Sequence, residues 1–200
     1  MRKILPLFSY LFHPIFIPVL GTLSCFLFDE NYLETRLKYL ILLQIAIVTI
    51  FIPLSFFFIL RSFGKVDSVM VSKISQRKIP LLIQSVLIFS LIKGVILDSI
   101  PELYFFYLAG LISTLLALGF LFLKIKASLH MMGISTLTTF VIGLSIHNQI
   151  NNINVIVILI LINGFVASSR LYMNAHTNKE LVIGFFLGLI PQMGLWYYWL

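Results

Sequence analysis

Charged residues are scarce in this chain, and their scarcity limits what kind of protein it can be. Asp, Glu, Lys and Arg make up 10% of the 200 residues, whereas hydrophobic residues make up 60%. The mean hydropathy of +1.06 lies well above the range of soluble domains. A hydrocarbon core about 30 Å thick needs about 20 apolar residues in helical form. We therefore expect an all-α, polytopic bundle of six or seven transmembrane helices that forms one membrane domain over residues 1–200.

Other features are missing as well. The single cysteine, Cys25, excludes an internal disulfide. The sequence has no Asp-rich pair of the kind by which magnesium-dependent prenyltransferases hold their metal. The apolar runs lack the alternation of apolar and polar residues that transmembrane strands show. Helices are therefore favoured over strands as the spanning elements.

Seven apolar runs, separated by charged or turn residues, are predicted to be spans. They cover residues 4–28, 39–60, 81–97, 103–123, 129–147, 153–168 and 181–199. The first run has no small-residue cleavage site, so we expect an uncleaved span rather than a signal peptide. Pro14, Pro18 and Pro53 should kink or interrupt the first two runs, with a break at His13-Pro14.

Basic residues gather on one side of the predicted bundle. If all seven runs cross, that side holds the N-terminus and the loops 61–80, 124–128 and 169–180. It carries eleven of the fourteen Lys and Arg residues, so the positive-inside rule would place it in the cytoplasm. These residues stand in short loops beside apolar runs rather than on one extended face. Lipid phosphates are therefore the expected anionic partners, and nucleic acid is not.

The loop between the last two runs carries the most specific pattern. It reads Ser169-Arg170, five residues, His176, three residues, Glu180. Ionisable residues at the edge of a membrane core are costly to hold there, so they are functional candidates. A carboxylate four residues after a histidine can hold one ring nitrogen protonated, which leaves the other as a nucleophile. This pattern resembles the third signature motif of the type-2 phosphatidic acid phosphatase superfamily, which has Asp in place of Glu180.

Two other loops on the same side resemble the remaining motifs of that superfamily. Lys73 and Arg77 resemble its Lys, six residues, Arg-Pro motif, with a different spacing. The segment with Lys126, Ser128 and His130 keeps the Ser and His of its Pro-Ser-Gly-His motif. Arginine offers a planar fork of donors for phosphate oxygens, and lysine adds a point charge. Three loops thus each supply part of one phosphate-binding site.

The resemblance covers roughly residues 73–190 and implies a role for each residue. His176 would be the nucleophile, Arg170 would stabilise the phosphate, Glu180 would hold His176, and His130 would protonate the leaving alcohol. The phosphate would also be contacted by Arg77, Lys73, Lys126 and Ser128. Such a pocket can transfer a phosphoryl group without a metal or another cofactor. The implied function is hydrolysis of lipid phosphates or lipid pyrophosphates, such as phosphatidic acid, phosphatidylglycerol phosphate or polyprenyl diphosphates, in the bacterial cytoplasmic membrane.

Two alternatives stay open from the sequence. A catalytically inactive relative could bind or carry anionic lipids through the same basic loops. A small transporter is the other alternative, since Gln44, Gln84 and Asn163 are polar residues within spans. Outside the motifs, His13 and His147 are expected to be interfacial or helix-end residues. The oligomeric state stays open.

Overall fold

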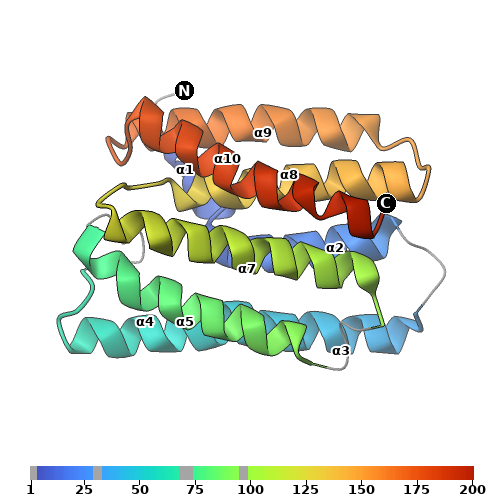
Figure 1. Ribbon diagram of the computed structural model, residues 1–200, viewed down its shortest axis with the longest axis horizontal. Coiled ribbons are helices and arrows are strands. Elements are labelled where there is room, and N and C mark those ends of the chain that lie inside the picture. Colours follow the sequence, from blue (N-terminus) through green and yellow to red (C-terminus); the bar gives the residue numbers. More distant parts are fainter. Residues whose placement is uncertain (1–3, 29–32, 68–73, 95–98) are drawn as a thin grey trace.

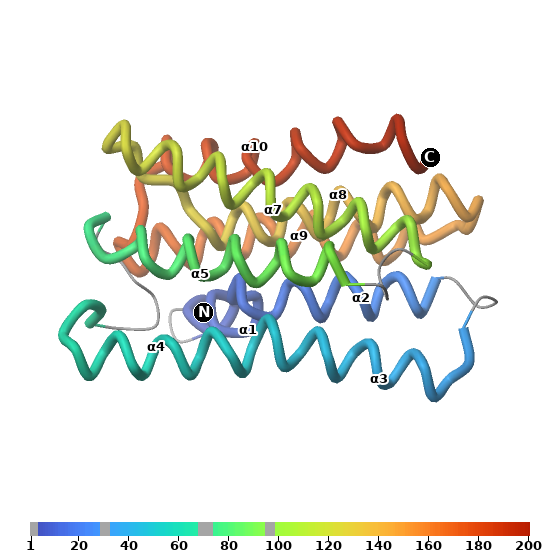
Figure 2. The backbone as a smooth tube through the Cα atoms, turned by 60° about the horizontal axis from the view of Figure 1, so that its bottom comes forward, coloured from blue at the N-terminus to red at the C-terminus, as the bar shows by residue number. Residues whose placement is uncertain are grey.

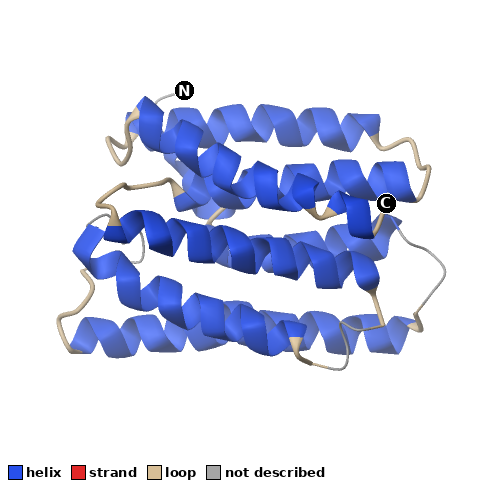
Figure 3. Ribbon diagram, in the orientation of Figure 1, coloured by secondary structure: helices blue, strands red, loops and turns tan. Residues whose placement is uncertain are grey.

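The protein is a bundle of helices. A computed structural model describes residues 4–28, 33–67, 74–94 and 99–200, and within them every regular element is a helix (Figure 3). The elements are α1 (Leu5–Leu11), η1 (Pro14–Phe16), α2 (Ile17–Phe28), α3 (Thr35–Ala46), η2 (Ile47–Phe51), α4 (Ile52–Ser62), α5 (Ile74–Ile92), α7 (Pro101–Phe122), α8 (Leu129–His147), α9 (Ile153–Tyr172), α10 (Asn178–Gly194) and η3 (Trp196–Tyr198). The long helices run side by side along the long axis of the molecule (Figure 1).

Within the described residues, six helical stretches are long and apolar enough to cross a membrane. They are Leu5–Phe28, Thr35–Ser62, Pro101–Phe122, Leu129–His147, Ile153–Tyr172 and Asn178–Tyr198. The predicted all-α, polytopic membrane bundle of six or seven spans is therefore confirmed. The protein has the architecture of an integral membrane protein.

The first span is broken where the sequence predicts a break. Helix α1 ends at Leu11, and His13 has an extended backbone with φ −65° and ψ 140°. A residue before proline is excluded from the helical region, so Pro14 stops α1 and opens the short 3₁₀ turn η1. Pro18 lies in the first turn of α2, where its missing N–H costs no helical hydrogen bond.

The second span contains a different irregularity. A π-helical turn, η2, ends at Phe51, two residues before Pro53, whose ring would clash with the carbonyl four residues earlier in a regular helix. The wider turn accommodates that ring. Segments η1 and η2 contact each other, so the two irregular stretches lie side by side within the bundle.

The third predicted span needs a correction at both ends. The prediction places it at residues 81–97, whereas α5 begins at Ile74 and ends at Ile92. Its first turns therefore include Arg77 and Lys78, and α5 is not among the six candidate spans. Helix α5 packs along α7 in both views of the backbone (Figures 1 and 2). Arg77 is thus buried in the first turns of a helix rather than lying in a loop, whereas Lys78 is exposed.

The loops with the motifs lie at one end of the bundle, as the predicted topology requires. That end holds the C-terminal ends of α4, α7 and α9 and the N-terminal ends of α5, α8 and α10, on the left of Figure 1. The opposite end holds the α8–α9 connection and the C-terminus (Figure 1). Lys73 lies outside the described residues.

Helix α8 is the centre of the fold, and α10 packs closely against it. A Cβ atom at Gly184 would meet the backbone carbonyl of Ser128, and one at Gly188 would meet the carbonyl of Met132. Small residues allow membrane helices to approach at backbone distance. The start of α10 is thereby fixed against the start of α8.

Candidate active site at one end of the bundle

Three motif residues from three elements meet at this end. His130 lies in the first turn of α8, Arg170 in the last turn of α9, and His176 in the loop before α10. All three side chains are buried, and Arg170 is only 1% exposed. Arg170 and His176 are both close enough to His130 for their charges to interact with it. The structure therefore brings the second and third sequence motifs into one cluster.

His176 is paired with a carboxylate. Its Nδ1 lies 2.7 Å from Glu180 Oε2. A carboxylate only accepts hydrogen bonds, so Nδ1 carries the proton and Nε2 keeps its lone pair. Thr177 and Glu180 also form a capping box that begins α10, which fixes the carboxylate with respect to the histidine. The local sequence thus builds both the helix start and the His–carboxylate pair.

Lys126 connects the second motif to the third. Its Nζ donates to the carbonyl of Ala175 at 2.8 Å and lies 3.6 Å from Glu180 Oε2. The loop before α8 is therefore held against the loop before α10. Ammonium, carboxylate and imidazole form one continuous chain of polar contacts.

Arg77 reaches the same cluster from α5. Its Nη1 donates to the carbonyl of Ala127 at 2.7 Å, and the side chain is 4% exposed. Glu180 and Arg170 lie within range of its charge. Two apolar runs separate Arg77 from the second motif in the sequence, but the bundle places the two together.

Ser128 and His130 are held by backbone groups. The Ser128 side chain caps α8 by accepting from Met131 N at 3.4 Å, and its own N–H donates to the carbonyl of Glu180 at 3.0 Å. The Ser128 residue is fully buried. His130 Nε2 lies 3.1 Å from the carbonyl oxygen of Ser9. A carbonyl only accepts, so this nitrogen carries a proton.

The first span also contributes to the site, which the sequence analysis missed. Ser9 Oγ lies 2.6 Å from Ser169 Oγ, which joins α1 to the end of α9. The His13 ring meets the His130 ring edge to face, with centroids 5.0 Å apart. His13 is therefore a site neighbour rather than only an interfacial residue. The signal that could have indicated this was a histidine directly before a proline inside an apolar run.

The electrostatics of the cluster favour a neutral His176 and a bound anion. Burial, together with the charges of Arg77, Lys126 and Arg170, lowers the pKa of His176 to about 4, and the bond to Glu180 opposes the shift. Burial also lowers the pKa of Lys126, with Glu180 opposing. Among the described residues around His176, three positive charges face one carboxylate, which leaves a net charge of +2.

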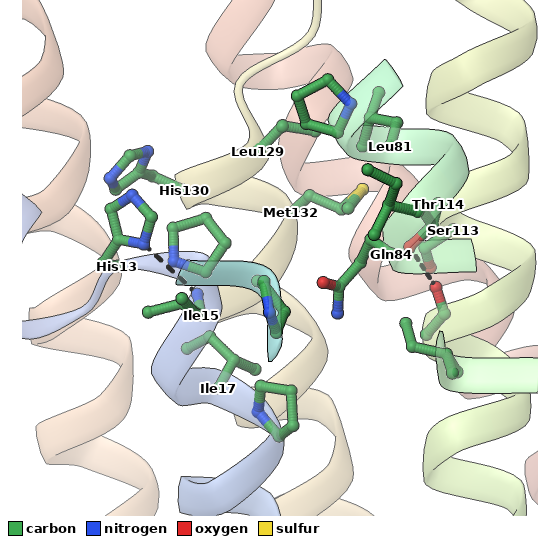
Figure 4. Close-up of a pocket in the computed structure, with 18 of the residues that line it drawn as sticks. His13, Ile15, Ile17, Leu81, Gln84, Ser113, Thr114, Leu129, His130 and Met132 are labelled. Atoms are coloured by element: carbon green, nitrogen blue, oxygen red, sulfur yellow. Dashed lines mark hydrogen bonds between the residues drawn. The ribbon is translucent and has the colours of Figure 1, made fainter. Parts of the chain in front are cut away.

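An apolar cavity of about 230 Å³ begins beside this cluster. It lies among η1, α2, α4, α5, α7 and α8, and Arg77 is among the residues that line it. His13 and His130 lie together on one side of it (Figure 4). Farther in, the hydroxyls of Ser113 and Thr114 are bonded to carbonyls of their own helix. The wall is therefore mostly apolar, and its polar members include the amide of Gln84 as well as Arg77 and the two histidines (Figure 4).

Neither a metal site nor a similar protein helps to identify the function of this cluster. Among the described residues, no group of three His, Cys, Asp or Glu side chains is placed to hold a metal ion. No family model, curated protein or solved structure matches the chain. The interpretation of the site therefore depends on its own geometry.

Proposed function

We propose that this protein is a membrane-embedded phosphatase of lipid phosphates or lipid pyrophosphates that forms a phosphohistidine at His176 and needs no metal. The observation that carries the proposal is the His176–Glu180 pair, with Nδ1 held at 2.7 Å, inside a cluster that Arg77, Lys126 and Arg170 make positive. This is the arrangement that the resemblance to the type-2 phosphatidic acid phosphatase superfamily implies.

The charge of the cluster suits a phosphate monoester. Such a group carries about −1.5 to −2 charges at neutral pH, which balances the net +2 of the cluster. Phosphoryl transfer depends mainly on positioning and on stabilising charge, both of which buried guanidinium groups provide. His176 is neutral at pH 7, since its pKa is lowered, and is therefore competent as a nucleophile.

The reaction would proceed in two steps. His176 Nε2 attacks phosphorus while the bond to the leaving oxygen breaks, and that oxygen takes a proton from His130, which must be in its imidazolium form for this step. The His130 Nε2–H donates to the Ser9 carbonyl, so the proton that leaves is the one on Nδ1, and the ring is left as a neutral imidazole. Water then attacks the phosphorus, the nitrogen–phosphorus bond breaks, and the water proton returns to His130 as phosphate leaves.

The cavity supports a lipid as the carrier of that phosphate. Its mostly apolar wall suits a hydrocarbon chain, and two residues of the basic cluster, Arg77 and His130, are among those that line it. Its volume of about 230 Å³ is below the range of about 300–1,000 Å³ for drug-sized ligands. We therefore expect it to take part of one chain rather than two whole chains.

The proposed location is the bacterial cytoplasmic membrane, with the active end toward the cytoplasm. The support for this orientation is the excess of Lys and Arg in the loops at that end.

Phosphate release from a panel of lipid phosphates tests the proposal. The panel contains phosphatidic acid, phosphatidylglycerol phosphate and a polyprenyl diphosphate, and the proteins are the wild type, His176→Ala and His147→Ala. His147, the last residue of α8, is a matched control because it pairs at 3.3 Å with Glu102 in the first turn of α7, and these two helix ends lie at the other end of the bundle (Figure 1). We expect release by the wild type and His147→Ala only. Equal release by His176→Ala would remove the proposal.

The second candidate is an inactive protein that binds anionic lipids. The observation that favours it is the burial of the site residues, which limits the access of a substrate: His176 is 7% exposed and Arg170 is 1% exposed. In that case no protein releases phosphate, and binding to phosphatidic acid vesicles is lost in Arg170→Ala but retained in His176→Ala. A transport path has less support, because Asn163 packs between α9 and α8 by donating to Thr138 Oγ1 at 2.7 Å.

A further inference from the structure

We propose that His13 is a positioning residue for His130, and that the break in the first span exists to hold the His130 ring from two sides. The inference rests on the proposed phosphatase function, in which His130 supplies the proton to the leaving oxygen. His13 belongs to none of the three sequence motifs.

The break releases a backbone carbonyl for His130. In a continuous helix the Ser9 carbonyl would accept from the N–H of residue 13. Pro14 forces His13 out of the helical region, so the last hydrogen bond of this helix runs from Phe12 N to Phe8 O at 3.0 Å. The Ser9 carbonyl then accepts from His130 Nε2 at 3.1 Å. One side of the imidazole is thus fixed by the broken helix itself.

The ring of His13 covers another side. Its Nδ1 accepts from Ile15 N at 3.3 Å, so this nitrogen is unprotonated and Nε2 carries the proton. The two imidazole planes lie at 89° with centroids 5.0 Å apart. Figure 4 shows the His13 ring directly beside His130, with its Nδ1 turned toward Ile15. The orientation of His13 is therefore fixed by the start of η1, and the His130 ring packs against it.

Both rings line the cavity that we propose for the chain, and Arg170 is close enough for its charge to interact with each of them. In a lipid phosphate, the oxygen that leaves joins the chain to phosphorus. A His130 ring free to rotate would present its proton to this oxygen only part of the time. Misplacing a catalytic group by about 1 Å can cost about 100-fold in rate.

A simpler role for His13 is helix capping, and one pair of variants separates the two roles. His13 is the N-cap of η1, and asparagine is among the best N-cap residues. His13→Asn therefore keeps a cap for Ile15 N but removes the ring that packs against His130. In His13→Gln the side-chain amide can extend about as far as Nε2 of the histidine ring, but glutamine is a poor N-cap residue. His147→Asn, at the opposite end, is the matched control.

The experiment measures kcat and KM for the lipid phosphate that the wild type hydrolyses fastest, together with thermal unfolding in detergent. We expect His13→Asn to unfold near the wild-type temperature, with kcat about 10- to 100-fold lower and KM nearly unchanged. His13→Gln should recover part of kcat, and His147→Asn should match the wild type. A wild-type kcat in His13→Asn would overturn the inference and leave the phosphatase function intact.

A second readout needs no turnover. In protein labelled with ¹⁵N in its imidazole rings, we expect the His130 signals to report a single Nε2–H tautomer, and His13→Asn to give a mixture of tautomers. If neither the wild type nor His176→Ala releases phosphate, the proposed function has failed. This spectrum then decides the positioning role alone, and an unchanged His130 tautomer in His13→Asn would overturn it.

Discussion

Replacing Glu180 with glutamine separates the catalytic role of this carboxylate from its structural one. Glu180 Oε2 lies 2.7 Å from His176 Nδ1, accepts from Thr177 N at 3.3 Å and lies 3.6 Å from Lys126 Nζ. Glutamine serves in capping boxes as well as glutamate does, and its amide oxygen can still accept from Nδ1–H. Glu180→Gln therefore keeps the helix start and the tautomer but removes the negative charge.

The expected loss follows from the difference between two kinds of hydrogen bond. A bond to a charged group contributes about 1.5–3 kcal/mol net and a neutral one about 0.5–1.5 kcal/mol, which leaves a difference of about 1–2 kcal/mol. His176 becomes cationic as its Nε2 bonds to phosphorus, so the carboxylate helps most in the transition state. At 1.36 kcal/mol per tenfold change, kcat should fall about 5- to 30-fold.

The assay is steady-state phosphate release with a lipid phosphate, together with thermal unfolding in detergent. Thr177→Ala is the matched control, because it removes the side-chain cap that accepts from Glu180 N at 3.4 Å and leaves the carboxylate beside His176. We expect this variant to lose about 1 kcal/mol of stability and little kcat. A wild-type kcat in Glu180→Gln, or an equal loss of kcat in Thr177→Ala, would refute the reasoning.

Three other predictions concern pH, packing and metals. Because burial lowers the pKa of His176 to about 4, the ¹⁵N imidazole signals of His176 in the protein without substrate should remain those of a neutral ring between pH 7.5 and pH 5; a titration with a midpoint near the ordinary histidine pKa of about 6.5 would contradict this. Gly184→Ala should lower the free energy of unfolding by about 1–3 kcal/mol, since its Cβ would meet the Ser128 carbonyl, whereas Gly164→Ala, with nothing within 4 Å, should change it little; equal stabilities would contradict the close packing of α10 on α8. EDTA should leave phosphate release unchanged, and activity lost to the chelator and restored by magnesium would show that a metal is required.

The sequence predicts the spans well because their signal is local. Long apolar runs have few alternatives to membrane helices, and the His13-Pro14 break follows from steric restriction before proline. The start of α5 was predicted wrongly, because Arg77 and Lys78 read as loop residues when only hydropathy is considered. In the structure Arg77 is buried against the Ala127 carbonyl, a contact that depends on how α5 packs.

The site itself was predictable only in part. The sequence predicts that His176 and Glu180 lie close together, because side chains four residues apart share one face of a helix. It also places Arg170 in the same short loop region. The contribution of the first span depends on a contact between residues 9 and 130, which no local pattern encodes. The same holds for the Lys126 bond to the loop before α10.

Direct detection of phosphohistidine tests the central claim. The purified wild type is mixed rapidly with the lipid phosphate it hydrolyses fastest, quenched in alkali, in which phosphohistidine survives, and digested for mass spectrometry. We expect a phosphoryl group on His176 in the wild type and none in His176→Ala. Steady hydrolysis with no phosphoryl group on any histidine, or with one on a residue other than His176, would contradict the account.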